Sequence, residues 1–165
     1  MQNKIRGRIW VLGDDIDTDV IYPGKYLPII VAEEMALHAL EGYDPEFPNK
    51  IQPGDIIVAG KNFGCGSSRE QAATCLKFAG LAAIAAKSYS RLFFRNAINQ
   101  GLPLVTSDLA DEVHEGDEIE IDFSSGEINY SGGVKTFPAL PDSVMDILRE
   151  GGLIPAVRKS LGIGG

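Results

Sequence analysis

The fold is decided by a segment that runs from Ile56 to Leu104 and reads IIVAGKNFGCGSSREQAATCLKFAGLAAIAAKSYSRLFFRNAINQGLPL. Two short apolar runs in it are typical of buried strands, and the stretches that follow them have helical composition. In chain order these predicted elements are Ile56–Ala59, Ala72–Ala79, Ala82–Ala86 and Tyr89–Asn99. The last helix stops at Gly101 and Pro103, and another strand follows. This alternation favours a parallel α/β core.

The flanking segments predict a further strand and a second kind of sheet. Ile5–Leu12 is rich in β-branched and aromatic residues, which indicates a strand, and Ala32–Leu40 has helical composition. Beyond residue 115 polar and apolar residues alternate, and turn residues separate three short runs. These runs, Asp117–Phe123, Glu127–Tyr130 and Val134–Phe137, predict an antiparallel β meander.

The length and organisation favour one domain over residues 1–165, because 165 residues lie near the usual domain size. We divide it into a loop at 13–31, the glycine-rich loop and α/β core at 55–105, and a C-terminal meander with short helices at 115–161. The shift in composition near Glu115 marks subregions and not two separate domains.

Charge and hydropathy exclude several classes of protein. Fifteen basic and 23 acidic residues give a net charge of −8, and nucleic-acid binding depends on Lys and Arg. The longest apolar-rich stretch, Gly80–Ala86, is far shorter than the ~20 residues that cross a bilayer. The first eight residues lack the apolar segment of a signal peptide. We therefore expect a cytoplasmic protein that binds neither nucleic acid nor membrane.

The two cysteines, Cys65 and Cys75, are too few to hold zinc or an iron–sulfur cluster by themselves. Both histidines, His38 and His114, lie far from them in the sequence. We expect reduced thiols and no metal site in this chain. Cys65 stays open as a nucleophile because it lies inside a glycine-rich loop.

That loop, Gly60–Glu70, is the strongest candidate site in the sequence. It brings glycines, two hydroxyls and a guanidinium to the start of a helix, which suits an anion such as a carboxylate. Ser67 and Glu70 also match a capping box, so Ser67 either caps the helix or faces a ligand. Neither the dinucleotide-binding nor the Walker glycine pattern is matched.

An acidic stretch, Asp15–Asp19, resembles the start of a calcium-binding loop. Val20 and Tyr26 stand where that loop requires glycine and glutamate, so an EF-hand is excluded. Two interpretations remain, a solvated acidic turn and part of a binding site.

Three motifs in order resemble one known family. GKNFGCGSSREQA at 60–72 resembles the signature loop of the aconitase swivelling domain, and more closely that of the small subunits of 3-isopropylmalate dehydratase and homoaconitase. DTDVIYP at 17–23 resembles the N-terminal substrate-side loop of this family, and KSYSRLFFRNAINQGLP at 87–103 its strand–helix–strand core. The resemblance runs from about Gly7 to Leu161.

The resemblance implies an α/β fold, an aconitase-like swivelling β/β/α domain with a parallel core and an added antiparallel meander. It also implies a hydro-lyase that moves a hydroxyl between adjacent carbons of a malate-type acid by dehydration and rehydration. Family enzymes bind the substrate on a [4Fe–4S] cluster held by a separate large subunit. We therefore expect a large-subunit partner, no cofactor bound by this chain and no activity of the chain alone. A homo-oligomer of the isolated chain stays open.

Residue roles follow from the same resemblance. Ser67 matches the family's catalytic base, which removes a proton from the carbon next to a carboxylate. Ser68 and Arg69 match residues that bind substrate carboxylates, and Asp19 belongs to the substrate-side loop. No role is implied for Arg91 or Arg95.

In this family the next loop faces the side group of the substrate, and here it comprises Tyr26, Leu27, Pro28, Ile29 and Ile30. Homoaconitase-like members carry an arginine there, whereas this loop has no cation. An unpaired carboxylate would be costly to desolvate, so we expect an apolar side group and 2-isopropylmalate as the substrate, in leucine biosynthesis. Citramalate, dimethylmalate and homoaconitate remain alternatives, and so does a stand-alone anion-binding or regulatory module without chemistry of its own.

Overall fold

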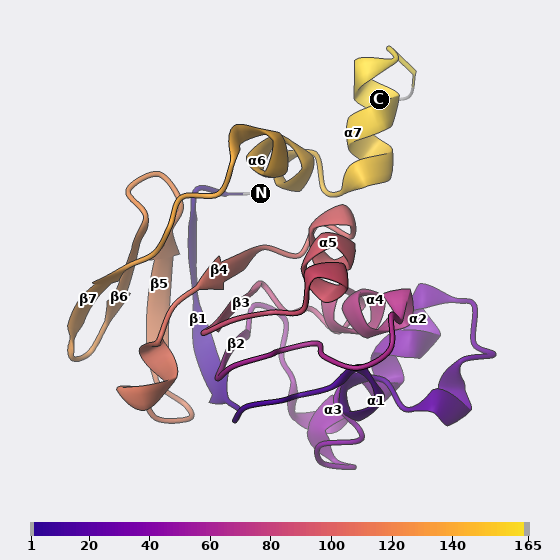
Figure 1. Ribbon diagram of the computed structural model, residues 1–165, viewed down its shortest axis with the longest axis horizontal. Coiled ribbons are helices and arrows are strands. Elements are labelled where there is room, and N and C mark those ends of the chain that lie inside the picture. Colours follow the sequence, from indigo (N-terminus) through magenta and orange to yellow (C-terminus); the bar gives the residue numbers. More distant parts are fainter. Residues whose placement is uncertain (1, 164–165) are drawn as a thin grey trace.

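The computed structural model describes residues 2–163 and contains a seven-stranded sheet in the order β4-β3-β2-β1-β5-β6-β7 (Figure 1). The strands are β1 (Lys4–Val11), β2 (Ile56–Ala59), β3 (Ala83–Ala86), β4 (Leu104–Thr106), β5 (Glu118–Asp122), β6 (Glu127–Tyr130) and β7 (Gly133–Thr136). β1 to β4 pair in parallel, whereas β5, β6 and β7 join in antiparallel pairs through β1. The predicted parallel core and meander are therefore confirmed.

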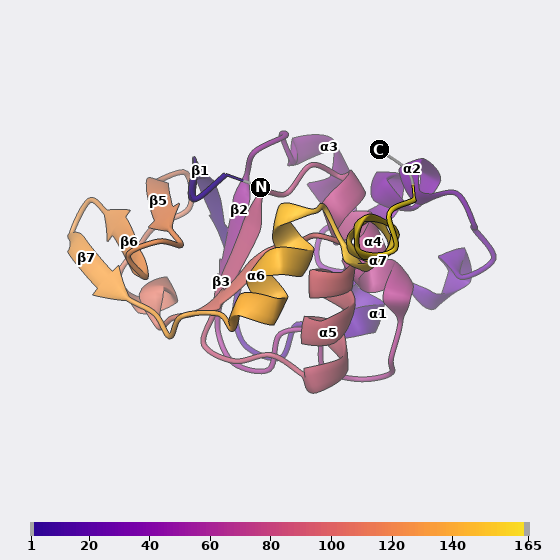
Figure 2. The same ribbon diagram turned by 90° about the horizontal axis from the view of Figure 1, so that it is seen from above.

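The parallel strands are buried on both faces, which explains their unbroken apolar runs. Along β2, Ile57 and Ala59 face the helices, while Ile56 and Val58 belong to a second core on the opposite face. The meander covers that second face with the alternate residues Ile119 and Ile121. The sheet is therefore curled, with helices gathered on one side of it and the meander on the other (Figures 1 and 2).

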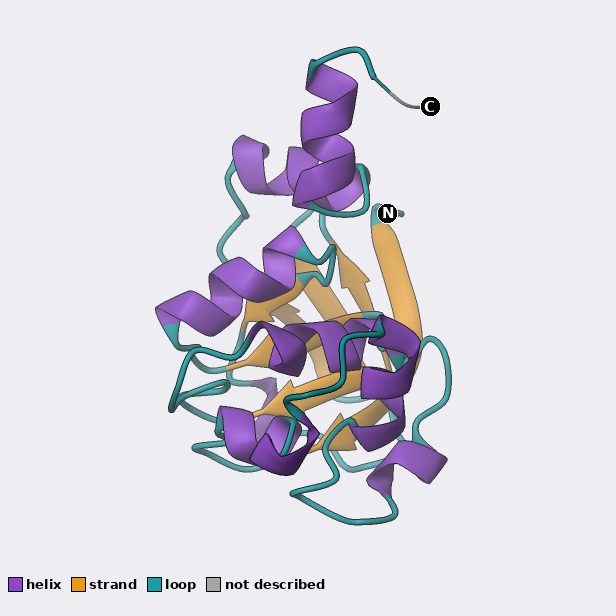
Figure 3. Cartoon of the chain, turned by 90° about the vertical axis from the view of Figure 1, so that its right-hand side faces the viewer, coloured by secondary structure: helices purple, strands orange, loops and turns teal. Residues whose placement is uncertain are grey.

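Helices α4 and α5 pack against each other on the helical face of the parallel strands. The chain contains α1 (Thr18–Ile21), α2 (Ala32–Met35), α3 (Phe47–Lys50), α4 (Glu70–Phe78), α5 (Arg91–Asn99), α6 (Asp142–Arg149) and α7 (Leu153–Ser160), with 3-10 turns η1 (Gly24–Tyr26), η2 (Ala36–His38) and η3 (Leu109–Asp111). The short helix α7 stands out from the rest of the molecule (Figure 3).

Three helical predictions need correction. The helix expected over Ala32–Leu40 is shorter, since α2 gives way to a 3-10 turn and Leu40 adopts a positive φ of 59°. α1 forms inside the expected acidic loop because Asp17 caps it, accepting a hydrogen bond from the Val20 amide. α3 forms where no helix was predicted, and Pro48 lies in its first turn, where proline is tolerated. Over residues 2–163, no helix combines the length and apolar character needed to cross a membrane.

Candidate active site

Three loops meet where the parallel strands β1, β2 and β3 end, and they enclose a cavity of about 260 Å³. In parallel α/β sheets ligands bind at the carboxyl ends of the strands. The cavity is lined by Thr18, Gly64, Gly66, Ser67, Ser68, Arg69, Ser90, Arg91, Leu92, Phe93 and Asn96. The structure therefore brings three of the predicted site residues, Ser67, Ser68 and Arg69, into one cavity.

The glycine-rich loop is fastened to the loop that enters α5. Phe63 forms a parallel bridge with Tyr89, and its amide donates to the Ser88 carbonyl over 3.0 Å. The Ser90 hydroxyl donates to the Gly64 carbonyl over 2.8 Å and also caps α5, accepting from the Phe93 amide. These contacts fix the start of α5 beside the loop that carries Ser67.

Gly64 explains why this loop needs glycine. Its φ is +81°, a conformation that side chains disfavour, and a Cβ there would overlap the ring of Phe93. The loop can therefore lie against α5 only with glycine at this position.

The N-terminal segment closes the other side of the cavity. The Thr18 amide donates to the Cys65 carbonyl over 2.8 Å, and the Thr18 hydroxyl donates to the Ser67 carbonyl over 2.8 Å. The Gly64 amide donates to the Ile16 carbonyl over 2.7 Å. The backbone of Ser67 is thus held in place by a side chain from a segment about fifty positions earlier in the sequence.

The capping-box prediction is wrong. α4 begins at Glu70 with Arg69 as its N-cap, because Arg69 is still extended at φ −123° and ψ 110°. Within residues 2–163 no side-chain oxygen caps the first turn of this helix, and the Ser67 hydroxyl has no hydrogen-bond partner. Ser67 is exposed and lines the cavity, so its hydroxyl is available to a ligand. The uncapped amides of α4 provide positive charge nearby.

Arg69 and Asp19 form an ion pair beside the cavity. Arg69 Nη1 lies 2.7 Å from Asp19 Oδ1 and donates to the Tyr22 carbonyl over 3.0 Å. The hydrogen bond from Arg69 lowers the pKa of the Asp19 carboxyl, and the Gly24 amide, which donates to the same oxygen, reinforces the effect. Asp19 is therefore ionised at neutral pH and orients the guanidinium through one of its nitrogens.

The loop Tyr26–Ile30, which is predicted to face the side group of the substrate and is called the specificity loop below, does not line this cavity. The Tyr26 hydroxyl donates to Glu41, and its ring stacks on His38 with the ring centroids 3.6 Å apart. Leu27 and Pro28 are exposed, while Ile29 packs partly against the helical core. Gly24, two positions before the loop, adjoins the site, because a Cβ there would lie 3.4 Å from Arg69 Nη2. Tyr26 therefore anchors the loop through contacts within this chain.

The neighbouring aspartates Asp14 and Asp15 are exposed to solvent, as in a solvated turn, and they also make specific contacts. Asp14 accepts from the Lys61 amide and Asp15 from the Asn62 side chain, over 2.8 and 2.9 Å. Asp17 caps α1. The acidic stretch thereby ties the end of β1 to the glycine-rich loop.

The cysteines do not fit a metal or a nucleophile. Burial, with Asp15 and Asp17 nearby, raises the pKa of the Cys65 thiol, which disfavours the thiolate. Cys75 is fully buried in α4, and burial raises its pKa further. Among residues 2–163 no group of three or more His, Cys, Asp or Glu side chains could hold a metal ion. The side chains of residues 2–163 therefore do not fit an iron–sulfur cluster.

Sequence reasoning missed the second wall of the cavity, which is formed by Ser90, Arg91 and Asn96 at the start of α5. A signal was present, since Ser90 precedes a helix that follows the next parallel strand. Because parallel strands end at the same edge of a sheet, the topology predicts that this segment lies beside the glycine-rich loop.

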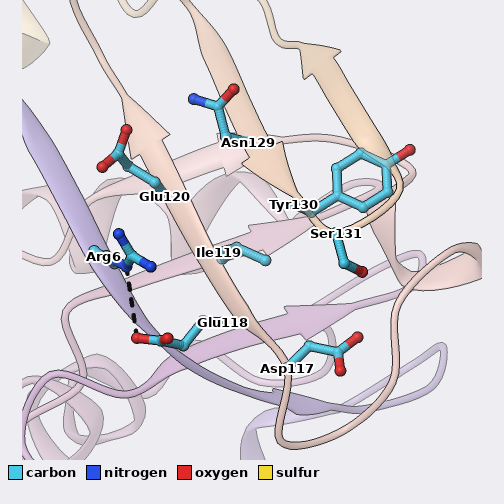
Figure 4. A pocket seen from close by; sticks show the side chains of 8 residues that line it. All are labelled: Arg6, Asp117, Glu118, Ile119, Glu120, Asn129, Tyr130 and Ser131. Atoms are coloured by element: carbon cyan, nitrogen blue, oxygen red, sulfur yellow. Dashed lines mark ion pairs between the residues drawn. The ribbon is translucent and has the colours of Figure 1, made fainter.

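A larger hollow of about 430 Å³ lies on the meander, between β1, β5 and β6 (Figure 4). Its walls carry Asp117, Glu118 and Glu120, whereas Arg6, its one cation, lies 3.6 Å from Glu118. The acidic lining disfavours an anionic ligand, so its size does not make this hollow the candidate site.

Comparisons with known proteins agree with this geometry. The aconitase C-terminal domain family matches residues 16–109. The 3-isopropylmalate dehydratase small subunit of Lachnospira eligens is 51% identical over 99% of both chains. The isopropylmalate/citramalate isomerase small subunit of Methanocaldococcus jannaschii is 48% identical over 98% of both chains. The methanogen homoaconitase small subunit of Methanothermobacter thermautotrophicus is 46% identical over 99% of this chain and 96% of the relative.

A solved structure extends the likeness to the whole fold. The crystal structure of 3-isopropylmalate dehydratase from Methanocaldococcus jannaschii superposes with a TM-score of 0.91 at 43% identity, over 96% of this chain and 95% of that one. The same fold therefore exists in an experimentally determined relative. With its sequence, its fold and its glycine-rich loop all matched, the chain belongs to the aconitase C-terminal domain family and, within it, to the small subunits of the 3-isopropylmalate dehydratase group.

Proposed function

We propose that this chain is the small subunit of a heteromeric hydro-lyase that converts 2-isopropylmalate to 3-isopropylmalate. The observation that carries the proposal is the free hydroxyl of Ser67, which lines the same cavity as Ser68 and Arg69. A serine that capped its helix would be occupied, whereas this one is available to a substrate. The names of the close relatives support a small subunit that works with a larger one.

In the proposed reaction Ser67 takes a proton from the carbon beside a substrate carboxylate. The hydroxyl on the adjacent carbon then leaves as hydroxide with the bonding electrons, which gives the alkene and leaves the proton on Ser67. Addition of hydroxide to the carbon that lost the proton, with return of that proton from Ser67 to the carbon that lost the hydroxyl, completes the isomerisation. The amide groups at the start of α4 and the guanidinium of Arg69 favour negative charge on the Ser67 oxygen and on the carboxylate as charge develops.

Arg69 and Ser68 are proposed to hold the substrate carboxylate. One Arg69 nitrogen is engaged by Asp19 and the Tyr22 carbonyl, which fixes the plane of the guanidinium. A guanidinium that is already held in place loses less side-chain conformational entropy when it binds a carboxylate than a mobile one does. The [4Fe–4S] cluster that family enzymes use belongs, in this proposal, to the large subunit.

The side group of the substrate is proposed to be apolar. The family resemblance predicts that the specificity loop faces this group, and Leu27 to Ile30 carry no cation, so a third carboxylate would lose its hydration without gaining a partner. Relatives of almost equal identity carry isopropylmalate, isopropylmalate/citramalate and homoaconitase in their names. We therefore place 2-isopropylmalate first and keep citramalate, dimethylmalate and homoaconitate as alternatives.

Anaerobic co-expression with the candidate large subunit, followed by assays on a panel of 2-hydroxy diacids and triacids, tests the proposal. We expect 2-isopropylmalate to be turned over with the highest kcat/KM, and neither subunit to be active alone. If a stable complex turned over no member of the panel, a stand-alone or regulatory anion-binding role would replace the enzymatic one. If a triacid were preferred, the assignment of the apolar side group would be wrong.

A further inference from the structure

We propose that Arg91 is a second cationic contact for the substrate, which grips the carboxylate that Arg69 does not hold. This inference rests on the proposed function and adds a residue to the same site. Arg91 is the first residue of α5 and lines the cavity together with Ser67, Ser68 and Arg69. The two arginines come from different helices, so the cavity has a cation in each of two walls.

Arg69 and Arg91 differ in how many of their hydrogen-bond donors already have a partner. Arg69 is ion-paired with Asp19 and bonded to the Tyr22 carbonyl, and its side chain is only 19% exposed. Arg91 is exposed, and within residues 2–163 its guanidinium makes no hydrogen bond or ion pair. It therefore has all its donors available at a site built for an anion.

The position of Arg91 is set by rigid neighbours. Ser90 caps α5 and is bonded to the Gly64 carbonyl, while Phe93 is buried against Gly64. These contacts fix the backbone of Arg91 relative to the loop that carries Ser67. Asn96, from the next turn, adds an amide to the same wall.

A malate-type acid has two carboxylates. The guanidinium of Arg69 is already partly engaged by Asp19 and the Tyr22 carbonyl, so it is poorly suited to hold both of them. Arg91 stands on the rim of the cavity and also borders the hollow beside Lys87 and Ser88. The ammonium of Lys87 is paired with Asp111, so Arg91 is the cation there that is free to turn inward. A second carboxylate entering beside Ser67 would meet its guanidinium.

The test compares Arg91→Gln and Arg91→Lys with the matched control Arg95→Gln, all in the reconstituted complex. Arg95 lies on the same helix one turn later and is also exposed, but it lies outside the lining of the cavity. Both Gln variants remove one charge from α5. Four quantities are measured: kcat for 2-isopropylmalate, KM for 2-isopropylmalate, binding of 2-isopropylmalate by calorimetry, and affinity for the large subunit.

We expect Arg91→Gln to raise KM and the dissociation constant about 10- to 100-fold, the range of one charge-assisted hydrogen bond. Its kcat should fall much less, Arg91→Lys should recover part of the loss, and Arg95→Gln should stay within about twofold of wild type. Unchanged binding in Arg91→Gln, or an equal loss in Arg95→Gln, would overturn the inference. A loss of affinity for the large subunit without a loss of substrate binding would instead make Arg91 an interface residue and overturn it too.

The calorimetric arm separates this inference from the proposed function. If the wild-type complex bound 2-isopropylmalate without turning it over, the proposed reaction would fail, yet the binding of the Arg91 variants would still decide the role of Arg91. If the complex did not bind 2-isopropylmalate at all, both proposals would be wrong. Turnover by wild type with unchanged Arg91→Gln would remove the inference alone.

Discussion

Ser67 is held by its backbone and not by its side chain, because Thr18 bonds its carbonyl while its hydroxyl stays free within the described residues. A change of this hydroxyl should therefore act on chemistry and leave folding unaffected. We predict that Ser67→Ala lowers kcat of the reconstituted enzyme at least about 100-fold, the lower range for loss of a general base. The melting temperature of the isolated chain should not change, since no helix cap is lost.

Steady-state kinetics and thermal unfolding check this prediction, with Ser131→Ala as the control, because Ser131 is an exposed serine next to the meander strand β6. The control should match wild type in both measurements. A Ser67→Ala enzyme that kept most of its kcat would exclude Ser67 as the base.

We expect Arg69 to bind the substrate through the planar shape of its guanidinium as much as through its charge. We predict that Arg69→Lys lowers kcat/KM at least about tenfold, because one ammonium cannot hold Asp19, the Tyr22 carbonyl and a substrate carboxylate together. The pKa of Asp19 lies below its usual value of 3.8, so the carboxylate partner persists at any pH above about 4 and is lost only below it.

The defect of Arg69→Lys should therefore be the same from pH 5 to pH 9. Measuring kcat/KM of wild type and variant across this range checks the point. A defect that vanished within the range would mean that some group other than the Asp19–Arg69 pair controls the site.

At the scale of elements, the specificity loop combines a fixed base with an exposed tip. Tyr26 is held by Glu41 and His38, and the Tyr22 hydroxyl donates to the Tyr26 carbonyl over 2.7 Å. Pro28 lies beyond these anchors and is exposed. A cation introduced at Pro28 should therefore leave the base in place and change the charge at the tip.

We predict that Pro28→Arg raises the ratio of kcat/KM for homoaconitate to that for 2-isopropylmalate at least about tenfold, since the third carboxylate gains a partner. Leu37→Arg, which adds the same charge to an exposed position outside the loop, should leave the ratio unchanged. A wild-type enzyme that already used the triacid efficiently would contradict the argument, because a cation would then have to come from elsewhere.

Elements whose signal is local were predicted well from the sequence. β2 and β6 match the expected ranges in full, because short apolar or alternating runs between turns define strands by themselves. The N-cap of α4 is Arg69, two positions after the Ser67 that the capping box indicated, since the Thr18–Ser67 contact and the extended Arg69 depend on distant segments. α1 was missed because it is a single turn whose cap, Asp17, looked like part of an acidic loop.

For the molecule as a whole, the parallel core and the meander could be predicted, but their joining could not. β1 pairs with β2 on one side and with β5 on the other, so one strand serves both halves. The alternation of Ile119 and Ile121 with polar residues does not indicate that they pack against Ile56 and Val58, on the face of β2 that is opposite the helices. The second wall of the candidate site was missed for the same reason, because Arg91 and Ser67 come to line one cavity through the tertiary arrangement of α4 and α5.

Without its partner, this chain should be unable to hold an iron–sulfur cluster. Cys75 is buried in α4 with its thiol directed at the Ala72 and Ile21 carbonyls, and Cys65 is held neutral by burial and nearby carboxylates. A cluster needs several exposed thiolates that converge, and two separated neutral thiols do not supply them. We predict that the isolated chain, incubated anaerobically with iron and sulfide and then desalted, keeps no stoichiometric iron and no cluster absorption. The same treatment of the two-subunit complex should yield both, whereas a brown isolated chain with stoichiometric iron would mean that this subunit holds the metal itself.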